Sequence, residues 1–204
     1  MTTAPGTLVI TSASGAEELG AVCVDSTVSG RARGGLRLVP DLTRRELELA
    51  ARVMTLKYGF LGLPQGGAKA GVIGDPEAPP EERADRLHRF AEAAAPLFTS
   101  RAYVPDSDMG TTGADIQAML EGVGIRVARR EYRGGRSGLY TAATVFASAR
   151  AAAAATGLPI AACRVAIEGF GRVGQPLAGM FHRAGARVVA TSTRRGGIVN
   201  PRGL

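Results

Sequence analysis

The sequence predicts an α/β fold made of two domains. Short runs of β-branched and apolar residues alternate with amphipathic helical segments along the chain. Near the C-terminus a strand, a glycine-rich turn, a helix and a second strand follow one another, which is the pattern of a parallel βαβ unit. The chain has 204 residues, 45% of them hydrophobic and 21% charged, so it is long enough for one large or two small globular domains.

Strands of one sheet are predicted in the N-terminal part, because short apolar runs are separated there by turn residues and helical segments. They are residues 7–12, 20–25, 35–39, 70–73 and 101–104. A glycine-rich loop that carries Lys69 runs into the fourth strand, and glycine lets a backbone approach other groups closely. Asp106 and Asp108 follow the fifth strand, at the strand end where α/β folds hold their ligands.

A helix is predicted from Thr43 to about Tyr58, since Thr43 and Glu46 have the spacing of a capping box. Its predicted apolar face consists of Leu47, Ala50, Val53 and Met54. Lys57 follows Ala50 by ~700° of helical rotation, so we expect its side chain on this buried face. A lysine that points inward needs a partner or a ligand.

Three further helices are predicted from helical spacing and composition. They cover residues 80–98, a short segment that contains Ile116, Met119 and Leu120, and the alanine-rich segment 139–156. Residues 124–138 are rich in Arg and Gly without periodicity, which is typical of a connection between domains. The C-terminal βαβ unit follows, with strands at 164–168 and 186–191 and a helix at 172–184.

The basic residues are divided very unevenly between the two types. Of the 25 basic residues only Lys57 and Lys69 are lysines, and the other 23 are arginines. A lysine can lose its proton and act as a base, whereas a guanidinium stays charged. The two lysines are therefore candidate functional residues, although two surface lysines that persist by chance would give the same composition.

The composition also disfavours several classes of protein. No window reaches the ~18 apolar residues of a membrane span, and Met1–Leu8 lacks the pattern of a secretion signal, so we expect a cytoplasmic protein. Cys23 and Cys163 have no spacing typical of a metal site or a disulfide framework, so no metal is expected. The net charge of +7 does not by itself indicate nucleic acid, because the arginines are scattered and aromatics amount to 5%.

Gly169, Gly171 and Gly174 form a GxGxxG turn between a strand and a helix, the context that dinucleotide binding requires. The first glycine allows the tight turn, the second admits a pyrophosphate, and the third lets the helix pack on the strand. NAD would favour an acidic residue at the end of the second strand, where Thr193 and Arg194 stand. The arginines there could pair with the 2′-phosphate of NADP, which favours NADP over NAD. The alternative is that they are solvated loop residues without a role in cofactor binding.

Several motifs together resemble the glutamate/leucine/phenylalanine/valine dehydrogenases. They are Gly34-Gly-Leu-Arg37, Met54-Thr-Leu-Lys57, Pro64-Gln-Gly-Gly-Ala-Lys69, Asp108-Met-Gly-Thr-Thr112, Gly169-Phe-Gly-Arg-Val-Gly174 and Gly196-Gly-Ile-Val-Asn-Pro201. The short N-terminus and the fourth motif resemble the leucine dehydrogenase branch. The resemblance implies a substrate-binding and oligomerisation domain at residues 1–136 and an incomplete NAD(P)-binding Rossmann domain at residues 137–204.

The resemblance also implies residue roles. Lys57 would bind the substrate α-carboxylate, Lys69 would be the catalytic lysine, and Asp108 would relay protons to and from the amine. A basic lysine needs a lowered pKa, and Lys57 as a neighbouring cation would contribute to that lowering. The implied substrate pocket is shaped by Gly34, Gly35, Gly66 and Gly67. The implied cofactor residues are Gly169, Phe170, Gly171, Arg172, Val173, Gly174, Thr141, Thr193 and Arg194. The implied reaction is reversible deamination of an L-amino acid to a 2-oxo acid by a homo-oligomer, with NAD or NADP as hydride acceptor.

The sequence departs from the family pattern at three positions and in length. Arg33 replaces the lysine or apolar residue of the two main branches, so the substrate stays open, and Thr144 and Thr193 replace a glycine and an acidic residue. The cofactor domain stops about 40 residues after Arg164, where such a domain needs more strands. Two strands and one helix leave apolar faces uncovered, so we expect Val188 and Val189 to be exposed unless something packs there.

These departures leave three hypotheses open. The first is an amino acid dehydrogenase represented by a truncated chain, and the second is a non-catalytic substrate-binding or oligomerisation module of the same family. A basic nucleic-acid binder is the third, and no sequence motif supports it.

Overall fold

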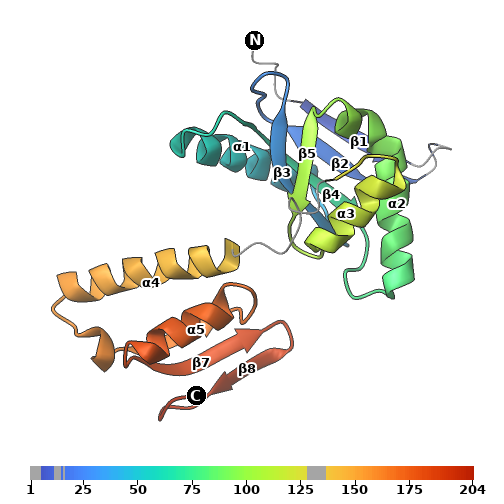
Figure 1. The fold of residues 1–204 in the computed structure, drawn as a ribbon. Coiled ribbons are helices and arrows are strands. Elements are labelled where there is room, and N and C mark those ends of the chain that lie inside the picture. Colours follow the sequence, from blue (N-terminus) through green and yellow to red (C-terminus); the bar gives the residue numbers. More distant parts are fainter. Residues whose placement is uncertain (1–5, 12–14, 16, 128–136) are drawn as a thin grey trace. The chain divides into compact units, whose positions relative to one another are not determined.

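The computed structural model describes residues 6–11, 15, 17–127 and 137–204. The chain divides into two compact units, Met1–Gly134 and Gly135–Leu204 (Figure 1). Each unit combines a sheet with helices, so the predicted α/β fold is confirmed. The predicted connection 124–138 lies mostly outside the described residues.

The first unit is built on a mixed five-stranded sheet of order β1-β2-β4-β3-β5. Its strands are β1 Gly6–Thr11, β2 Glu18–Val24, β3 Ala32–Val39, β4 Gly66–Ile73 and β5 Tyr103–Ser107. The pairs β1–β2 and β2–β4 are antiparallel, while β4, β3 and β5 run parallel. All five predicted strands are present, and parallel strands place the ends of β3 and β5 at one edge of the sheet.

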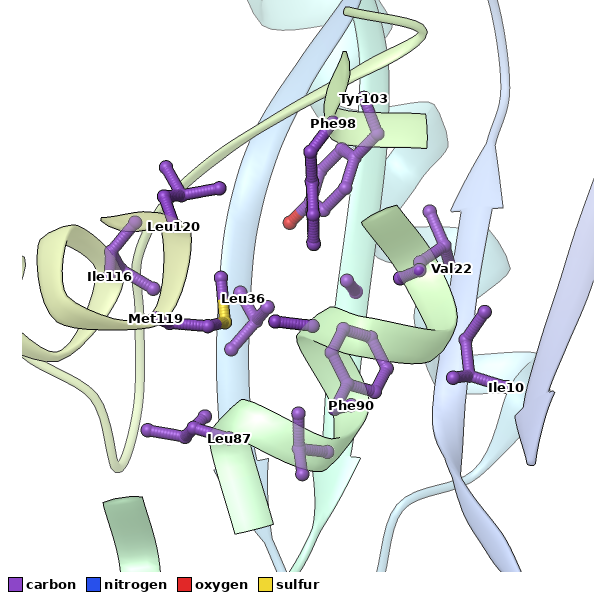
Figure 2. Packing of buried hydrophobic residues seen from close by; sticks show 14 of the residues in the cluster. Ile10, Val22, Leu36, Leu87, Phe90, Phe98, Tyr103, Ile116, Met119 and Leu120 are labelled. Atoms are coloured by element: carbon purple, nitrogen blue, oxygen red, sulfur yellow. The ribbon is translucent and has the colours of Figure 1, made fainter. Parts of the chain in front are cut away.

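Helices cover both faces of this sheet (Figure 1). On one face lies α1 (Arg44–Phe60), and on the other lie α2 (Pro80–Thr99) and α3 (Gly113–Gly122). The main core fills the space under α2 and α3, where Phe90, Phe98 and Tyr103 pack against Leu36 (Figure 2). A smaller cluster, which includes Ala51, seats α1 on β2.

The buried face of α1 differs from the predicted one. Leu47, Ala51 and Tyr58 are buried, whereas Val53 is 60% exposed and Lys57 is also exposed. Apolar residues stand on both sides of α1, so periodicity alone did not identify the face that packs. The prediction that Lys57 points into the core is therefore wrong.

The predicted start of α1 is confirmed in part. The Thr43 hydroxyl accepts a hydrogen bond from the Glu46 N–H at 3.2 Å, as an N-cap does. The Glu46 carboxylate, which a capping box would turn back to the cap, pairs with Arg37.

The second unit contains a three-stranded sheet of order β6-β7-β8. Its elements are α4 Ser137–Ala155, a short 3-10 helix Ile160–Ala162, β6 Arg164–Glu168, α5 Gly174–Arg183, β7 Arg187–Thr193 and β8 Gly196–Val199. The pair β6–β7 is parallel and β7–β8 is antiparallel. The core lies under α4 and α5, where the rings of Phe146 and Phe181 meet edge to face at 5.2 Å.

Val188 and Val189 are each only 9% exposed, so the second part of the conditional expectation applies: other elements pack over them. Val188 packs in the cluster with Leu177 and Phe181 of α5. β8 extends the sheet beside β7, and the backbone N–H of Leu204 donates to the carbonyl of Val188 at 2.9 Å. The sequence did not predict β8, since its two leading glycines are more typical of a turn.

Candidate active site

A polar strip runs along the α1 side of the parallel strands. Side chains alternate along a strand, so Arg33, Gly35 and Arg37 of β3 share one face. Arg33 pairs with Gly67 and Arg37 with Gly71, which puts Lys69 of β4 beside Gly35 on the same face. The other face of these strands packs into the main core. The sheet thus separates an apolar side from a charged side.

Lys69, Asp108 and Arg37 form an ion-pair network on this strip. The Lys69 Nζ atom lies 2.5 Å from Oδ2 of Asp108, and the Arg37 Nε atom lies 3.2 Å from the same oxygen. Lys69 is 9% exposed and Arg37 is 7% exposed, so both cations are largely removed from solvent. Two donors on one carboxylate oxygen hold that oxygen in a defined place.

Asp108 is positioned by its backbone as well as by its charge. Its N–H donates to the Thr111 hydroxyl at 2.9 Å, and that hydroxyl donates to the Leu36 carbonyl at 2.8 Å. Burial alone would raise the pKa of Asp108, but the hydrogen bond and charge of Lys69 together with the charge of Arg37 outweigh it. The pKa of Asp108 therefore lies below its ordinary value, and the group is a carboxylate at neutral pH.

Four glycines of β3 and β4 have steric reasons to be glycine. A Cβ atom on Gly35 would lie 2.8 Å from Asp108 Cβ and 3.1 Å from Lys69 Nζ. The corresponding atom on Gly34 would lie 1.6 Å from the Ala68 carbonyl oxygen. A Cβ on Gly66 would lie 2.1 Å from the Ser26 carbonyl oxygen, and a Cβ on Gly67 would lie 2.2 Å from the backbone nitrogen of Thr55 in α1. Gly35 is thus the glycine that opens space between Lys69 and Asp108.

A second charged pair lies further along the strip. Arg33 Nη2 contacts Oδ2 of Asp106 at 3.2 Å, with their side chains 26% and 50% exposed. Burial raises the pKa of the Tyr58 phenol, whose charged neighbours are Arg33 and Asp106. Lys57 adjoins this group, with its Nζ atom 6.0 Å from the centre of the Tyr58 ring. Within the described part of the chain Lys57 has no ion pair, so its ammonium remains available to a ligand.

The glycine-rich turn belongs to the second unit and joins β6 to α5. Gly169 has φ of +87°, a backbone conformation that favours glycine, and a Cβ on Gly174 would lie 1.9 Å from the Gly169 carbonyl oxygen. A Cβ on Gly171 would meet nothing within 4 Å, so this backbone faces open space. No side chain caps α5, and its first amides are oriented toward this turn. Such a turn fits a pyrophosphate at a helix N-terminus.

Other predicted cofactor residues surround the same turn. A Cβ on Gly138 would lie 2.3 Å from the Arg172 carbonyl oxygen, so the first turn of α4 lies against the glycine-rich turn. Thr141 follows one helical turn later and is exposed. Thr193 and Arg194 lie where β7 turns into β8, because Thr193 pairs with Gly196.

A groove of about 750 Å³ lies on the second unit. Its walls come from α5 and the β7–β8 hairpin, and its lining includes Phe170, Gln175, His182, Thr193, Arg195 and Ile198. At one end the groove reaches the glycine-rich turn and the end of β7, the two places where a dinucleotide is held in this kind of unit, and from there it extends along α5 to His182. The residues present therefore fit a dinucleotide.

Sequence reasoning missed two residues of this site. Arg37 lies two residues after Gly35 on β3 and shares the Asp108 carboxylate with Lys69, and Thr111 fixes the Asp108 backbone. The strand alternation that places Gly35 on the site face also places Arg37 there, so that signal was available. Among the described residues no group of three or more His, Cys, Asp and Glu side chains could hold a metal ion. No described helix is long and apolar enough to cross a membrane.

Two family models match the chain. The model described as Glu/Leu/Phe/Val dehydrogenase, dimerisation domain, matches residues 14–123. The model described as Glutamate/Leucine/Phenylalanine/Valine dehydrogenase matches residues 134–204. The first match alone covers more than half of the chain.

Curated relatives and solved structures agree with these matches. The cryptic catabolic NAD-specific glutamate dehydrogenase GudB of Bacillus subtilis is 31% identical over 190 residues. Its counterpart RocG of the same organism is 30% identical over 187 residues, which are 86% of this chain and 44% of the relative. A hetero-hexameric glutamate dehydrogenase from Thermus thermophilus aligns with a TM-score of 0.77 and 28% identity, over 100% of this chain and 53% of that one. The chain thus spans less than half the length of the curated relatives it matches.

Proposed function

The chain belongs to the Glu/Leu/Phe/Val dehydrogenase family, and from this premise we propose that it catalyses the reversible oxidative deamination of an L-amino acid to a 2-oxo acid and ammonia. The observation that carries this proposal is the contact of 2.5 Å between Lys69 Nζ and Asp108 Oδ2 on the polar strip. A base and a proton relay in direct contact are what removal of a proton from an amine requires. Both residues match the family motifs at the positions of the catalytic lysine and aspartate.

The residues of the first unit receive the following roles in the proposal. Lys57 binds the substrate α-carboxylate, for which its solvent-facing ammonium is suited. Lys69 first passes its ammonium proton to the contacting Asp108 carboxylate and from there to solvent, and the neutral amine that remains acts as the general base. Asp108 also passes protons between the substrate amine and solvent through its partly exposed carboxylate. Arg37 is a positioning residue, because it holds the Asp108 oxygen that Lys69 contacts. Gly34, Gly35, Gly66 and Gly67 remain the proposed pocket residues.

The second unit binds the hydride acceptor in this proposal. A bound NAD or NADP would accept the hydride that leaves the substrate α-carbon. Gly169, Gly171 and Gly174 would hold its pyrophosphate at the start of α5, and the open space at Gly171 supports this placement. The B. subtilis relatives are NAD-specific by name, whereas Arg194 in the exposed β7–β8 turn could pair with a 2′-phosphate. We propose residues 1–136 and 137–204 as the two functional domains.

The relatives and the sequence motifs favour different substrate side chains. The curated relatives quoted above are glutamate dehydrogenases, while the motif at Asp108–Thr112 resembles the leucine branch. An acidic substrate side chain needs a cation, and Arg33 in the strip already contacts Asp106 at 3.2 Å. An uncharged substrate side chain leaves that pair intact. We therefore propose an uncharged L-amino acid, with L-glutamate as the alternative.

A second candidate function rests on the length of the match. Because the chain covers 44% of its B. subtilis relatives, a non-catalytic substrate-binding or oligomerisation module of the same family is the alternative. In either case we propose that the chain assembles with copies of itself, as a domain described as a dimerisation domain would.

The test is an assay of the purified protein with a panel of L-amino acids and either NAD or NADP. Formation of the reduced cofactor, followed by its absorbance, is expected with at least one amino acid. A flat trace from a protein that circular dichroism shows to be folded would favour the non-catalytic module. The rates with leucine and with glutamate identify the preferred substrate side chain, and the rates with NAD and with NADP identify the preferred cofactor.

A further inference from the structure

The Glu46 carboxylate is the outermost member of a row of four alternating charges. Lys69 and Arg37 contact Oδ2 of Asp108 at 2.5 Å and 3.2 Å, and Nη1 of the Arg37 guanidinium contacts Oε1 of Glu46. The four residues come from β4, the segment after β5, β3 and α1. A continuous series of ion pairs thus joins the proposed base to the first turn of α1.

Arg37 is the most buried side chain of this row. Its side chain is 9% exposed, whereas that of Glu46 is 50% exposed. A guanidinium stays charged near neutral pH, and a buried charge is costly unless anions pair with it. Within the described part of the chain the ion pairs of Arg37 are those with Asp108 and Glu46. Without Glu46, Asp108 would be left to compensate this cation alone.

Glu46 stands at a position where a different contact is usual. It is the third residue of α1, from which an acidic side chain turns back to the cap N–H in a capping box. The α3 helix has that arrangement, since the Asp115 carboxylate accepts a hydrogen bond from the Thr112 N–H at 2.7 Å. In α1 the Thr43 hydroxyl still caps the helix, but the Glu46 carboxylate contacts Arg37 instead. The Glu46 side chain therefore serves the charge row rather than its own helix.

We infer that Glu46 is a positioning residue of the site, which holds the Arg37 guanidinium and compensates its charge so that the Asp108 oxygen stays shared between Arg37 and Lys69. The inference rests on the proposed function for its effect on turnover, whereas its effect on Lys69 can be measured without turnover. If the Glu46 carboxylate is removed, the Arg37 guanidinium competes more strongly with Lys69 for Asp108. The contact that carries protons away from Lys69 weakens as a result.

The substitution Glu46→Gln in the whole chain tests the inference, and Glu48→Gln is the matched control. Glu48 lies on the same helix, its side chain is 46% exposed, and it pairs with Arg45 at 3.8 Å, outside the row. Both substitutions remove one negative charge from the beginning of α1, so effects on the helix dipole or on the net charge are common to both. Circular dichroism and thermal unfolding compare the folding of the two variants.

Trace acetylation reports on Lys69 directly, because Lys57 and Lys69 are the only lysines of the chain. Each protein is treated with a small amount of acetic anhydride at mildly alkaline pH, and peptide mass spectrometry gives the labelling of Lys69 relative to the exposed Lys57. Only the neutral amine reacts, so an ammonium that a carboxylate holds is labelled slowly. We expect labelling of Lys69 to be at least ~3-fold faster in Glu46→Gln and unchanged in Glu48→Gln. Unchanged or slower labelling in Glu46→Gln overturns the inference, whether or not the protein turns over an amino acid.

Steady-state kinetics measure the effect on the proposed reaction. In Glu46→Gln we expect kcat to fall by at least ~10-fold while KM for the amino acid and the cofactor stays within about 2-fold, because the relay is displaced and the binding groups are not. In an Arg37→Met background Glu46→Gln should have no further effect, since Glu46 acts through Arg37. A full loss in that background, or a raised KM with kcat unchanged, contradicts the inference. A wild type without turnover on any amino acid refutes the proposed function, and the acetylation result then decides the role of Glu46 by itself.

Discussion

The ammonium of Lys69 on β4 reaches across β3 to contact the carboxylate of Asp108, which follows β5, at 2.5 Å. The contact is possible because β3 presents Gly35 at the crossing point, where a Cβ would lie 2.8 Å from Asp108 Cβ. The cation of β4, the gap at Gly35 of β3 and the carboxylate that follows β5 thus lie side by side. Arg37, two residues beyond the gap, adds the second cation.

The gap at Gly35 predicts a loss of turnover from a single methyl group. Gly35→Ala places a Cβ 2.8 Å from Asp108 Cβ and 3.1 Å from Lys69 Nζ, so these side chains have to separate. Displacements of about 1 Å in a catalytic pair cost ~100-fold in rate, and we expect that loss in kcat with little change in the circular dichroism spectrum. Gly59→Ala, whose added Cβ meets nothing within 4 Å, is the control and should retain activity. Equal activities in the two variants would show that the gap does not matter.

The charge network predicts how stability depends on pH. The folded-state pKa of Asp108 lies below its ordinary value of 3.8, so the ionised carboxylate contributes stability that is complete above about pH 4 and is lost as the pH falls through the folded pKa. Asp108→Asn should lower the free energy of unfolding by ~1–3 kcal/mol at pH 7, and by less at pH 3 and below. Urea unfolding at a series of pH values measures this difference. The exposed Asp41→Asn serves as the control, and a pH-independent effect of Asp108→Asn would contradict the assignment.

Two glycines of the same turn predict opposite phenotypes. Gly171→Ala adds a Cβ into open space, so the protein should keep its thermal stability and lose affinity for NAD(P)H, because the methyl group occupies the path of the pyrophosphate. Gly174→Ala forces a Cβ to within 1.9 Å of the Gly169 carbonyl oxygen, so it should lower the melting temperature. Thermal unfolding and cofactor fluorescence titration separate the two effects. Unchanged cofactor affinity in Gly171→Ala would argue against binding at this turn.

The Arg33–Asp106 contact predicts a change in substrate choice. Arg33→Met removes the cation and leaves Asp106 unpaired in the strip. A lone carboxylate repels an acidic substrate, so we expect kcat/KM for L-glutamate to fall by at least ~10-fold relative to that for L-leucine. Steady-state kinetics with both amino acids provide the ratio. If the ratio is the same in the variant and the wild type, Arg33 does not face the substrate side chain.

The helices and strands of this protein were largely accessible from the sequence because their signals are local. The strands at 35–39 and 70–73 carry apolar residues on one face, and the turn at Gly169–Gly174 needs glycine for reasons of backbone geometry and close packing. The predicted pair Lys69 and Asp108 came from motif resemblance, and the structure brings these two residues into contact. Their contact depends on which strands pair, and no local signal encodes that.

The features that the sequence did not predict also depend on contacts between distant segments of the chain. Lys57 was expected inside because α1 is apolar on two faces, and only packing against β2 and β4 decides which face is buried. Val188 packs against α5, and β8 pairs with β7. β8 was not predicted because its two leading glycines are not typical of a strand. Arg37 was overlooked because its importance lies in its contact with Asp108, which follows β5, although its place on the same face as Gly35 was foreseeable.

Lys69 is proposed as the general base of the oxidative deamination, and the substitution Lys69→Arg tests this role. Arginine keeps the positive charge and the contact with Asp108 but cannot act as a base near neutral pH. The measurement is the initial rate of NAD(P)H consumption with a 2-oxo acid and ammonia, and of NAD(P)H formation with the amino acid, for wild type and Lys69→Arg. We expect the rate in both directions to fall by at least ~10³-fold in the variant while substrate and cofactor still bind. A Lys69→Arg protein that turns over at a rate near that of the wild type would contradict it.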